Sequence, residues 1–432
     1  MTASRVAYLN ARLLDPASGL DTPGALLIED GKIIDFGAEL FRDGAPSVSQ
    51  VVDCDGLCLA PGLIDMRVQL REPGEEHKET IETASRAAEA GGVTTMVALP
   101  NTTPVIDDVS VVEFMHRRAH AIGTVKVRCY GSVTRGTKGE QLTEMGLLAE
   151  AGAVAFTDGT KAVADTMVMR RALSYARGFG LIIAQHPEDP NLANGGVMNE
   201  GEIASRLGLS GIPSAAEAIM IERDLRLVEL TGGRYHAAHI STAEAVEAIR
   251  RAKARGLDVT CDTAPHYFSL NETAVGDYRT FAKVSPPLRS EDDRKAIVEG
   301  LGDGTIDVVA SDHTPSDQDS KRLPFAQAEF GIVGLETLLT LMLEPFHNGA
   351  LTLLGALAKV TSNPAQLLGL RAGRLERGAA ADLVLFNPNT PWRIEEAGFR
   401  SKSKNTPYDG RPVQGRVVET LVDGRSVYKL AS

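Results

Sequence analysis

Four ionisable side chains in this sequence have the chemistry of a metal-assisted hydrolase. Asp158, His186, His239 and Asp312 each stand at the end of a different short apolar segment. Neutral imidazoles and carboxylates hold divalent ions, and such an ion acidifies a bound water and polarises a carbonyl group. A nearby carboxylate then serves as general base and afterwards as acid toward a leaving nitrogen. This pattern favours Asp158, His186 and His239 as ligands, with Asp312 as the base.

Arg67 and Gln69 stand where a hydrolase of this kind often carries two histidines. They lie two residues apart in the stretch PGLIDMRVQLREPG, so both side chains point to the same face of a predicted strand. Arginine is permanently cationic and cannot ligate a metal, and glutamine offers zinc only a neutral amide oxygen. We therefore expect Arg67 either to pair with Asp158 or Asp312, or to turn out to solvent.

Eight short apolar segments must position these side chains. Most are separated by stretches with apolar residues at three- and four-residue steps, and several of these stretches end in glycine, as helices do. Strand–helix alternation repeated eight times predicts a closed parallel (β/α)8 barrel of the TIM type over residues 59–369. The predicted strands cover residues 63–68, 93–100, 125–133, 153–159, 181–186, 235–241, 258–265 and 307–313.

The C-terminal ends of such strands form one rim, so residues far apart in the sequence converge there. A lone histidine or aspartate at a strand end is more often a hydrogen-bonded loop residue than a ligand. Four of them on four strands favour a site derived from a metal centre. Side-chain alternation predicts a buried structural role for His236 and turns His313 to the other face. We expect Lys161 in solvent and loop 315–331 over the mouth of the site.

Both ends of the chain have a different pattern. Residues 1–58 and 370–432 contain short β-rich stretches broken by Asp-Gly and Pro-Gly turns, including the hairpin signal Asp423-Gly424. We expect the two ends to pair into one composite β-sandwich beside the barrel.

The composition restricts the classes of function. The chain has 432 residues and a net charge of −12, which disfavours nucleic-acid binding because such binding needs a basic face. Its four cysteines form no CxxC pair, as in a reduced cytosolic protein. No apolar run approaches the ~18 residues of a membrane span, and no basic region followed by an apolar stretch opens the chain. We expect a cytoplasmic protein that binds no membrane.

A series of short motifs runs along the whole chain. It comprises PGLIDMRVQLREPG, GGVTTMVALPNTTP, AFTDG, HPEDP, HIST, APH, SPPLR, SDHTP and PFAQAEFGIVGLETLL. These motifs resemble those of dihydroorotases of the long bacterial type, which are cyclic amidohydrolases, and the combination of REPG, NTTP and GIVGLET is specific to that branch. The resemblance implies a (β/α)8 barrel with a composite β-sandwich, zinc at the rim, and reversible ring closure of carbamoyl aspartate to dihydroorotate.

The metal-binding positions of this family are only partly matched. The resemblance implies that its paired metal-binding histidines fall on Arg67 and Gln69, so both are replaced here. The position of its bridging ligand, a carboxylated lysine or an aspartate, falls on Asp158. Its later histidine ligands fall on His186 and His239, which are present.

Of the family's catalytic and substrate-binding positions, some are matched in this sequence and others are replaced. Its catalytic aspartate falls on Asp312, which we count among the residual metal ligands as well. Arg71 and Asn101 match groups that hold the substrate carboxylate. An asparagine expected before Pro-Pro is replaced by Ser285, and a histidine expected four residues after the catalytic aspartate is replaced by Ser316.

Three hypotheses remain open at this point. In the first, the chain is a dihydroorotase homologue with weak or lost catalysis that acts as a partner of aspartate carbamoyltransferase, as inactive members of the family do. In the second, it is an active dihydroorotase or related cyclic amidase with a single metal on Asp158, His186 and His239. In the third, it is a binding module that holds a small acidic ligand, like dihydroorotate, without turnover. We expect zinc at reduced occupancy, no organic cofactor, and a homo-oligomer.

Overall fold

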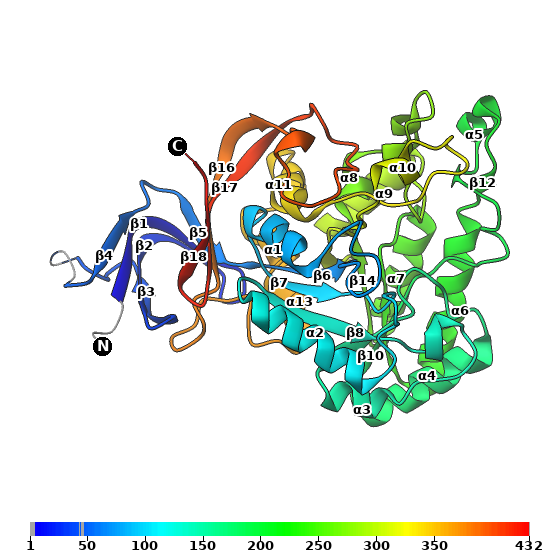
Figure 1. Cartoon of the computed structure of the whole chain (residues 1–432), viewed down its shortest axis with the longest axis horizontal. Helices are drawn as coiled ribbons and strands as arrows, with labels where there is room; N and C mark the ends of the chain where they lie inside the picture. Colours follow the sequence, from blue (N-terminus) through cyan, green and yellow to red (C-terminus); the bar gives the residue numbers. More distant parts are fainter. Residues whose placement is uncertain (1–4, 43, 45–46, 432) are drawn as a thin grey trace.

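The computed structural model describes residues 5–42, 44 and 47–431. It consists of a barrel with helices around it and a β-sheet region at one end, where the N-terminal and C-terminal strands lie together (Figure 1). No helix within these described ranges is both long and apolar enough to cross a membrane.

Eight parallel strands form the barrel, which confirms the predicted fold class. They are hydrogen-bonded in chain order, and a parallel bridge between Val68 and His313 joins the last strand region to the first. Every residue of the first two strands is buried, as expected for strands covered on both faces. The strands are β6 (Leu63–Val68), β7 (Val93–Ala98), β8 (Lys126–Gly131), β9 (Ala153–Phe156), β10 (Ile182–Gln185), β13 (Arg234–Ala237), β14 (Val259–Thr263) and β15 (Val308–Val309).

Helices surround these strands (Figure 1), and several begin at a side chain that caps their first turn. Asp108, Asp165 and Thr242 each accept a hydrogen bond from a backbone N–H of the helix that follows, which satisfies an otherwise unpaired donor. The helices are α1 (Ile81–Ala90), α2 (Val109–Ile122), α3 (Met145–Glu150), α4 (Thr166–Gly178), α6 (Ala215–Thr231), α7 (Ala243–Ala254), α9 (Glu291–Gly302), α11 (Leu338–His347), α12 (Leu353–Ala358) and α13 (Ser362–Leu367).

Shorter elements lie in the connections. They are the strand pair β11 (Met198–Asn199) and β12 (Gly211–Ile212), the helices α5 (Glu202–Leu207), α8 (Pro265–Ser269) and α10 (Gln318–Lys321), and the 3-10 turns η1 (Arg135–Thr137), η2 (Glu272–Val275), η3 (Thr280–Ala282), η4 (Leu335–Thr337) and η5 (Glu396–Gly398).

Strands from both ends of the chain pair in one sheet, as the sequence predicts. Its order is β18-β17-β16-β5-β1-β2-β3, with β4 paired to β1, and the antiparallel contact of β16 with β5 joins the two ends. Asp423 (φ 48°) and Gly424 (φ 70°) form the turn of the predicted hairpin. The strands are β1 (Arg5–Asp15), β2 (Leu20–Glu29), β3 (Lys32–Gly37), β4 (Gln50–Asp53), β5 (Cys58–Pro61), β16 (Leu383–Arg393), β17 (Pro412–Val422) and β18 (Arg425–Lys429).

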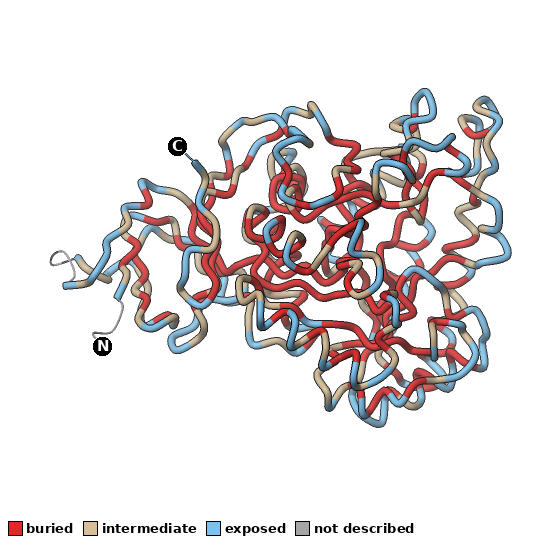
Figure 2. Tube along the Cα trace, in the orientation of Figure 1, coloured by how far each residue is buried: buried red, intermediate tan, exposed pale blue. Residues whose placement is uncertain are grey.

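The sheet has an apolar core of its own, which includes Leu13, Leu26, Ile33 and Leu59. The main core lies between the barrel strands and their helices, where Figure 2 shows nearly continuous burial along the strands. Because β5 leads directly into β6, the sheet is covalently joined to the first barrel strand. The residues at which one domain ends and the other begins stay a prediction.

Candidate functional site

A cavity of about 380 Å³ opens at the rim formed by the C-terminal strand ends. Six residues singled out from the sequence or its resemblance line it, and they come from separate strand ends and loops: Arg67, Gln69, Arg71, Asn101, Ser285 and Asp312. Asp158, His186 and His239 are buried beside it, with exposed fractions of 1%, 4% and 1%. Glu329, Phe330 and Gly331 also line the cavity, so the loop expected at its mouth lies there.

Arg67 forms a buried ion pair with Asp312. Its Nε donates to Oδ1 of Asp312 at 2.7 Å, and its Nη2 donates to the carbonyl of Gly159 at 3.3 Å. The two side chains are only 4% and 10% exposed. Of the alternatives that the sequence left open, the structure therefore selects pairing with Asp312. Asp65 accepts the backbone N–H of Arg67 at 3.2 Å, which helps to fix this strand end.

His186 and His239 face each other directly. Nδ1 of His186 lies 2.7 Å from Nε2 of His239, and Nδ1 of His239 lies 3.5 Å from Oδ2 of Asp312. Burial, followed by the positive charge of Arg67, lowers the pKa of His239 well below its usual value. His239 is therefore neutral at physiological pH, and the two rings share one hydrogen bond beside the Arg67–Asp312 pair.

The carboxylate of Asp158 is held by Thr134. The backbone N–H of Thr134 donates to its Oδ1 at 2.9 Å, and the Thr134 hydroxyl donates to its Oδ2. Burial raises the pKa of Asp158, although these hydrogen bonds oppose the rise. Thr134 follows strand β8, and the sequence pattern did not predict that it would hold Asp158.

These donors do not fit a metal ion. Within residues 5–42, 44 and 47–431, no three His, Cys, Asp or Glu side chains are grouped so that they could hold one. The guanidinium of Arg67 lies against Asp312, and a fixed cation at that position repels a divalent ion. The zinc implied by the resemblance therefore has no complete ligand set in this arrangement.

Gln69 acts as a hydrogen-bonding bridge across the rim. Its Oε1 accepts from Nδ2 of Asn101 at 3.0 Å, and its Nε2 donates to Oγ1 of Thr314 at 2.9 Å. Its amide thus joins the loops that follow β7 and β15. Asn101 is a predicted substrate contact, and its Nδ2 already donates one hydrogen bond to Gln69.

Arg71 is neutralised within the cavity by a residue that sequence reasoning missed. Its Nη1 donates to Oε2 of Glu75 at 2.7 Å, and its Nε donates to the carbonyl of Pro315 at 3.0 Å. Lys78 donates to Oε1 of Glu75 at 2.7 Å and to Glu329 at 3.0 Å. Burial opposes ionisation of Glu75, but Lys78 and Arg71 outweigh it and lower its pKa. The spacing of Arg71, Glu75 and Lys78 in REPGEEHK was the available signal.

The remaining predicted positions have different surroundings. Ser285 donates to Oε1 of Glu188 at 3.3 Å, and the backbone N–H of Ser316 donates to Asn405 at 3.1 Å. His236 is buried and lies 2.7 Å from Oδ2 of Asp262, which confirms its structural role. His313 lies away from the cavity, where its Nδ1 accepts from Gly334 at 3.1 Å.

Comparison with known proteins gives matches over nearly the full chain. Residues 56–245 match the family model described as dihydro-orotase-like, and residues 337–428 match that of the amidohydrolase family. The chain is 49% identical over 429 residues to a dihydroorotase of Wolbachia from Drosophila simulans, covering 99% of this chain and 96% of the relative. It is 48% identical to a dihydroorotase of Pelobacter propionicus, covering 97% and 98% of the two chains.

Solved structures show the same fold. L-hydantoinase (dihydropyrimidinase) from Arthrobacter aurescens superposes with a TM-score of 0.87 at 26% identity, covering 98% of this chain and 96% of that chain. Dihydropyrimidinase from Brevibacillus agri gives a TM-score of 0.84 at 22% identity, covering 98% and 95%. With the barrel, the composite sheet and the full-length sequence matches taken together, this chain belongs to the dihydroorotase family of the amidohydrolase superfamily.

Proposed function

We propose that this chain is a dihydroorotase homologue in which catalysis is weak or lost, and that it acts in pyrimidine synthesis as a partner of aspartate carbamoyltransferase. The observation that carries the loss of catalysis is the ion pair between Nε of Arg67 and Oδ1 of Asp312, at 2.7 Å. In this proposal Arg67 and Gln69 replace the paired metal-binding histidines of the family.

The ion pair removes two requirements of the hydrolase mechanism. An arginine cannot generate hydroxide from water, because it neither gives up a proton at neutral pH nor binds water as a Lewis acid. Asp312, the expected base, is engaged in this ion pair, so its Oδ1 is occupied by the Nε–H of Arg67 and not by a reacting water. The site therefore keeps its shape while lacking the means to activate water.

The retained part of the site supports binding of a small acidic ligand such as dihydroorotate. Arg71 and Asn101 both line the cavity. A ligand carboxylate that approaches Arg71 must compete with Glu75, which already accepts its Nη1 at 2.7 Å. We therefore propose weak binding of such ligands.

Hydrolysis of dihydroorotate with added zinc tests the loss of catalysis. We expect little or no turnover by the wild-type chain, measured beside an active dihydroorotase as a positive control. Brisk zinc-dependent turnover would reject the proposal.

A second candidate function is an active cyclic amidase with a single metal on Asp158, His186 and His239. The closeness of Nδ1 of His186 and Nε2 of His239, 2.7 Å apart, favours it, because small turns of the two rings away from their shared hydrogen bond would let both reach one ion. This candidate requires Asp158 to leave Thr134, and it predicts turnover that the Asp158→Asn variant loses.

The partnership with aspartate carbamoyltransferase is supported by the family resemblance. Co-expression and co-purification with the aspartate carbamoyltransferase of the same cell test it, with size-exclusion chromatography of each protein alone as the control. A stable complex is expected. Separate elution of the two proteins at micromolar concentration would contradict it, and the chain alone should elute as a homo-oligomer.

A further inference from the structure

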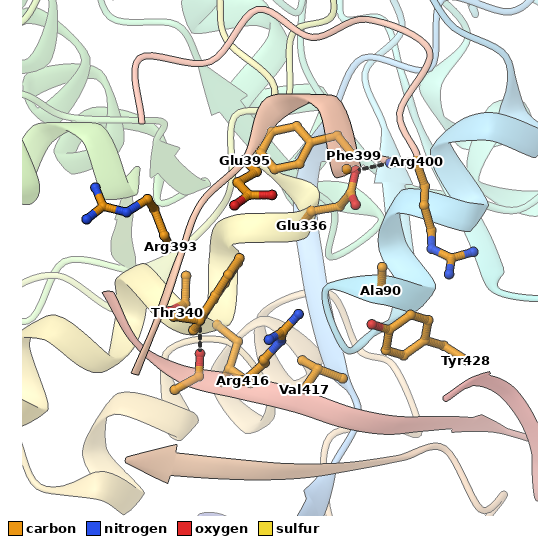
Figure 3. A pocket seen from close by; sticks show the side chains of 14 residues that line it. Ala90, Glu336, Thr340, Arg393, Glu395, Phe399, Arg400, Arg416, Val417 and Tyr428 are labelled. Carbon is orange, nitrogen blue, oxygen red and sulfur yellow. Dashed lines mark hydrogen bonds between the residues drawn. The ribbon is translucent and has the colours of Figure 1, made fainter. Parts of the chain in front are cut away.

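A second cavity, of about 220 Å³, lies between the barrel and the composite sheet (Figure 3). It shares no lining residue with the rim cavity. Its walls come from the C-terminal end of α1, from η4 and α11, and from β16, β17, β18 and the segment after η5. The residues that matter for its chemistry are Glu336, Trp392, Phe399, Arg400, Arg416 and Tyr428.

Two arginines line this cavity beside aromatic rings. The guanidinium carbon of Arg416 lies 5.2 Å from the centre of the Trp392 ring, and that of Arg400 lies 5.1 Å from the centre of the Tyr428 ring. In Figure 3 the guanidinium of Arg416 lies to the left of the Tyr428 ring and that of Arg400 lies above it. A guanidinium over a ring is attracted by the negative face of the ring, and its N–H groups stay available as donors to an anion.

Neither guanidinium has a carboxylate partner in the part of the chain that the structure describes. The ion pairs there involve other arginines, such as Arg411, which lies 2.9 Å from Glu344. A planar cation that is stacked on a ring and lacks an ion-pair partner can still donate two parallel hydrogen bonds to an anion.

The carboxylates of the cavity offset only part of this charge. Glu336 accepts the backbone N–H groups of Arg400 at 2.7 Å and Ser401 at 3.1 Å, and burial raises its pKa to about 7. Its negative charge is therefore partial near neutrality, and Glu395 supplies a second, exposed carboxylate. Arg393 also lines the cavity. The lining is thus locally positive although the chain carries a net charge of −12.

We propose that this cavity binds a small molecule with one planar aromatic ring and one acidic group. The ring would stack against Trp392, Tyr428 or a guanidinium plane, and the acidic group would accept hydrogen bonds from Arg400 and Arg416. Pockets for drug-sized ligands measure roughly 300–1,000 Å³, so a cavity of about 220 Å³ favours a single-ring ligand. The acidic group can be a carboxylate or a phosphate, because guanidinium recognises both.

Trp392 provides a direct readout, because it is the only tryptophan in the chain. Its fluorescence is measured while the full chain is titrated with benzoate, phenyl phosphate, inorganic phosphate and benzamide. Benzoate and phenyl phosphate each carry a ring and one of the two acidic groups. Inorganic phosphate lacks the ring, and benzamide lacks the acidic group.

We expect a saturable change in fluorescence with benzoate or phenyl phosphate. The affinity for at least one of them should be about tenfold or more higher than for inorganic phosphate or benzamide. The tighter of the two ring probes identifies the acidic group. The Arg416→Gln variant should weaken this binding about tenfold or more, because it removes one charged donor. Arg416→Lys keeps the charge but not the planar guanidinium. Its affinity for the ring probes should lie between those of the wild type and of Arg416→Gln, and it replaces the glutamine variant if that variant does not fold.

The matched control is Arg117→Gln, which changes an exposed arginine on α2, a helix that contributes no residue to this cavity, and should leave binding unchanged. No saturable change with either ring probe would overturn the proposal. Equal affinity for inorganic phosphate and phenyl phosphate would overturn it as well, and so would unaltered binding by both Arg416 variants.

Discussion

At the scale of single residues, one arginine gives the rim its character. Arg67 brings a permanent charge into a buried position where its Nε is 2.7 Å from Asp312. Burial lowers the pKa of His266 to about 4; Asp312 opposes this shift, and the charge of Arg67 adds a smaller contribution to it. Arg67 therefore acts as a built-in cation that pairs with Asp312 and adds to the effect of burial on the pKa of His239 and His266.

Removal of this cation should destabilise the chain. Arg67→Met leaves Asp312 charged and unpaired in a buried position, which should cost about 3–5 kcal/mol of unfolding free energy. Adding Asp312→Asn should recover part of the loss, since the unpaired charge is then gone. Urea denaturation measures both variants. Arg86→Met, which breaks an exposed pair, is the control and should change stability by less than ~0.5 kcal/mol. A similar small loss for Arg67→Met would show that the buried pair contributes no stability.

At the scale of elements, the loop at the mouth of the site is held from inside by a lysine. Nζ of Lys283 donates to the carbonyls of Phe325 at 2.8 Å and Ala328 at 2.7 Å, and it lies 4.5 Å from the centre of the Phe330 ring. These contacts fix the segment that carries Glu329 to the rim.

Lys283→Met should loosen this loop more than the rest of the chain. The variant leaves buried carbonyls without their donor, at a cost of about 1–3 kcal/mol. Hydrogen exchange should therefore rise over residues 318–331 and stay unchanged in the barrel strands. Lys295→Met, at an exposed position, is the control. Unchanged exchange in the loop would mean that other contacts hold it.

The turn η4 should give the stability of the molecule a defined pH dependence. Burial raises the pKa of Glu336 from its usual 4.5 to about 7, against the opposing charges of Lys404 and Arg400. The folded chain thus binds an extra proton between about pH 4.5 and 7, so this group lowers stability as pH rises through that range.

Glu336→Gln removes this effect, because the amide oxygen can still accept the N–H groups of Arg400 and Ser401. The stability gain of the variant over the wild type should be small near pH 5, grow to about 1–3 kcal/mol as pH rises to 7, and stay level from pH 7 to 8. Thermal unfolding of both proteins across that range measures it. A difference independent of pH would contradict the assignment.

At the scale of the whole molecule, the alternation of short apolar strands with amphipathic helices was sufficient to predict the barrel. The β-rich ends predicted a shared sheet, and the contact of β16 with β5 confirms it. The pairing of Arg67 could not be settled from the sequence, because Asp158 and Asp312 both stand at strand ends. The backbone N–H of Thr134 donates a hydrogen bond to Asp158, which leaves Asp312 as the partner of Arg67. This contact depends on how the strands are arranged around the barrel.

The spacing of Arg71 and Glu75 was a signal for their ion pair, but the spacing alone does not fix the pairing. It depends on the path of a loop, and Arg71 itself has a positive φ of 60°. Sequence patterns predict which residues lie at the rim. Their hydrogen-bond and ion-pair partners depend on how the closed barrel and its loops bring the strand ends together.

The most direct test of this account is the zinc content of the chain, measured by elemental analysis after exposure to zinc and removal of free metal. The wild type should hold less than one zinc per chain, because Arg67 lies against Asp312 and Asp158 is held by Thr134. The Arg67→His/Gln69→His double variant should take up more zinc, since two imidazoles would then replace the cation and the amide. Two tightly bound zinc ions per wild-type chain would contradict the central proposal that Arg67 takes the place of a metal centre.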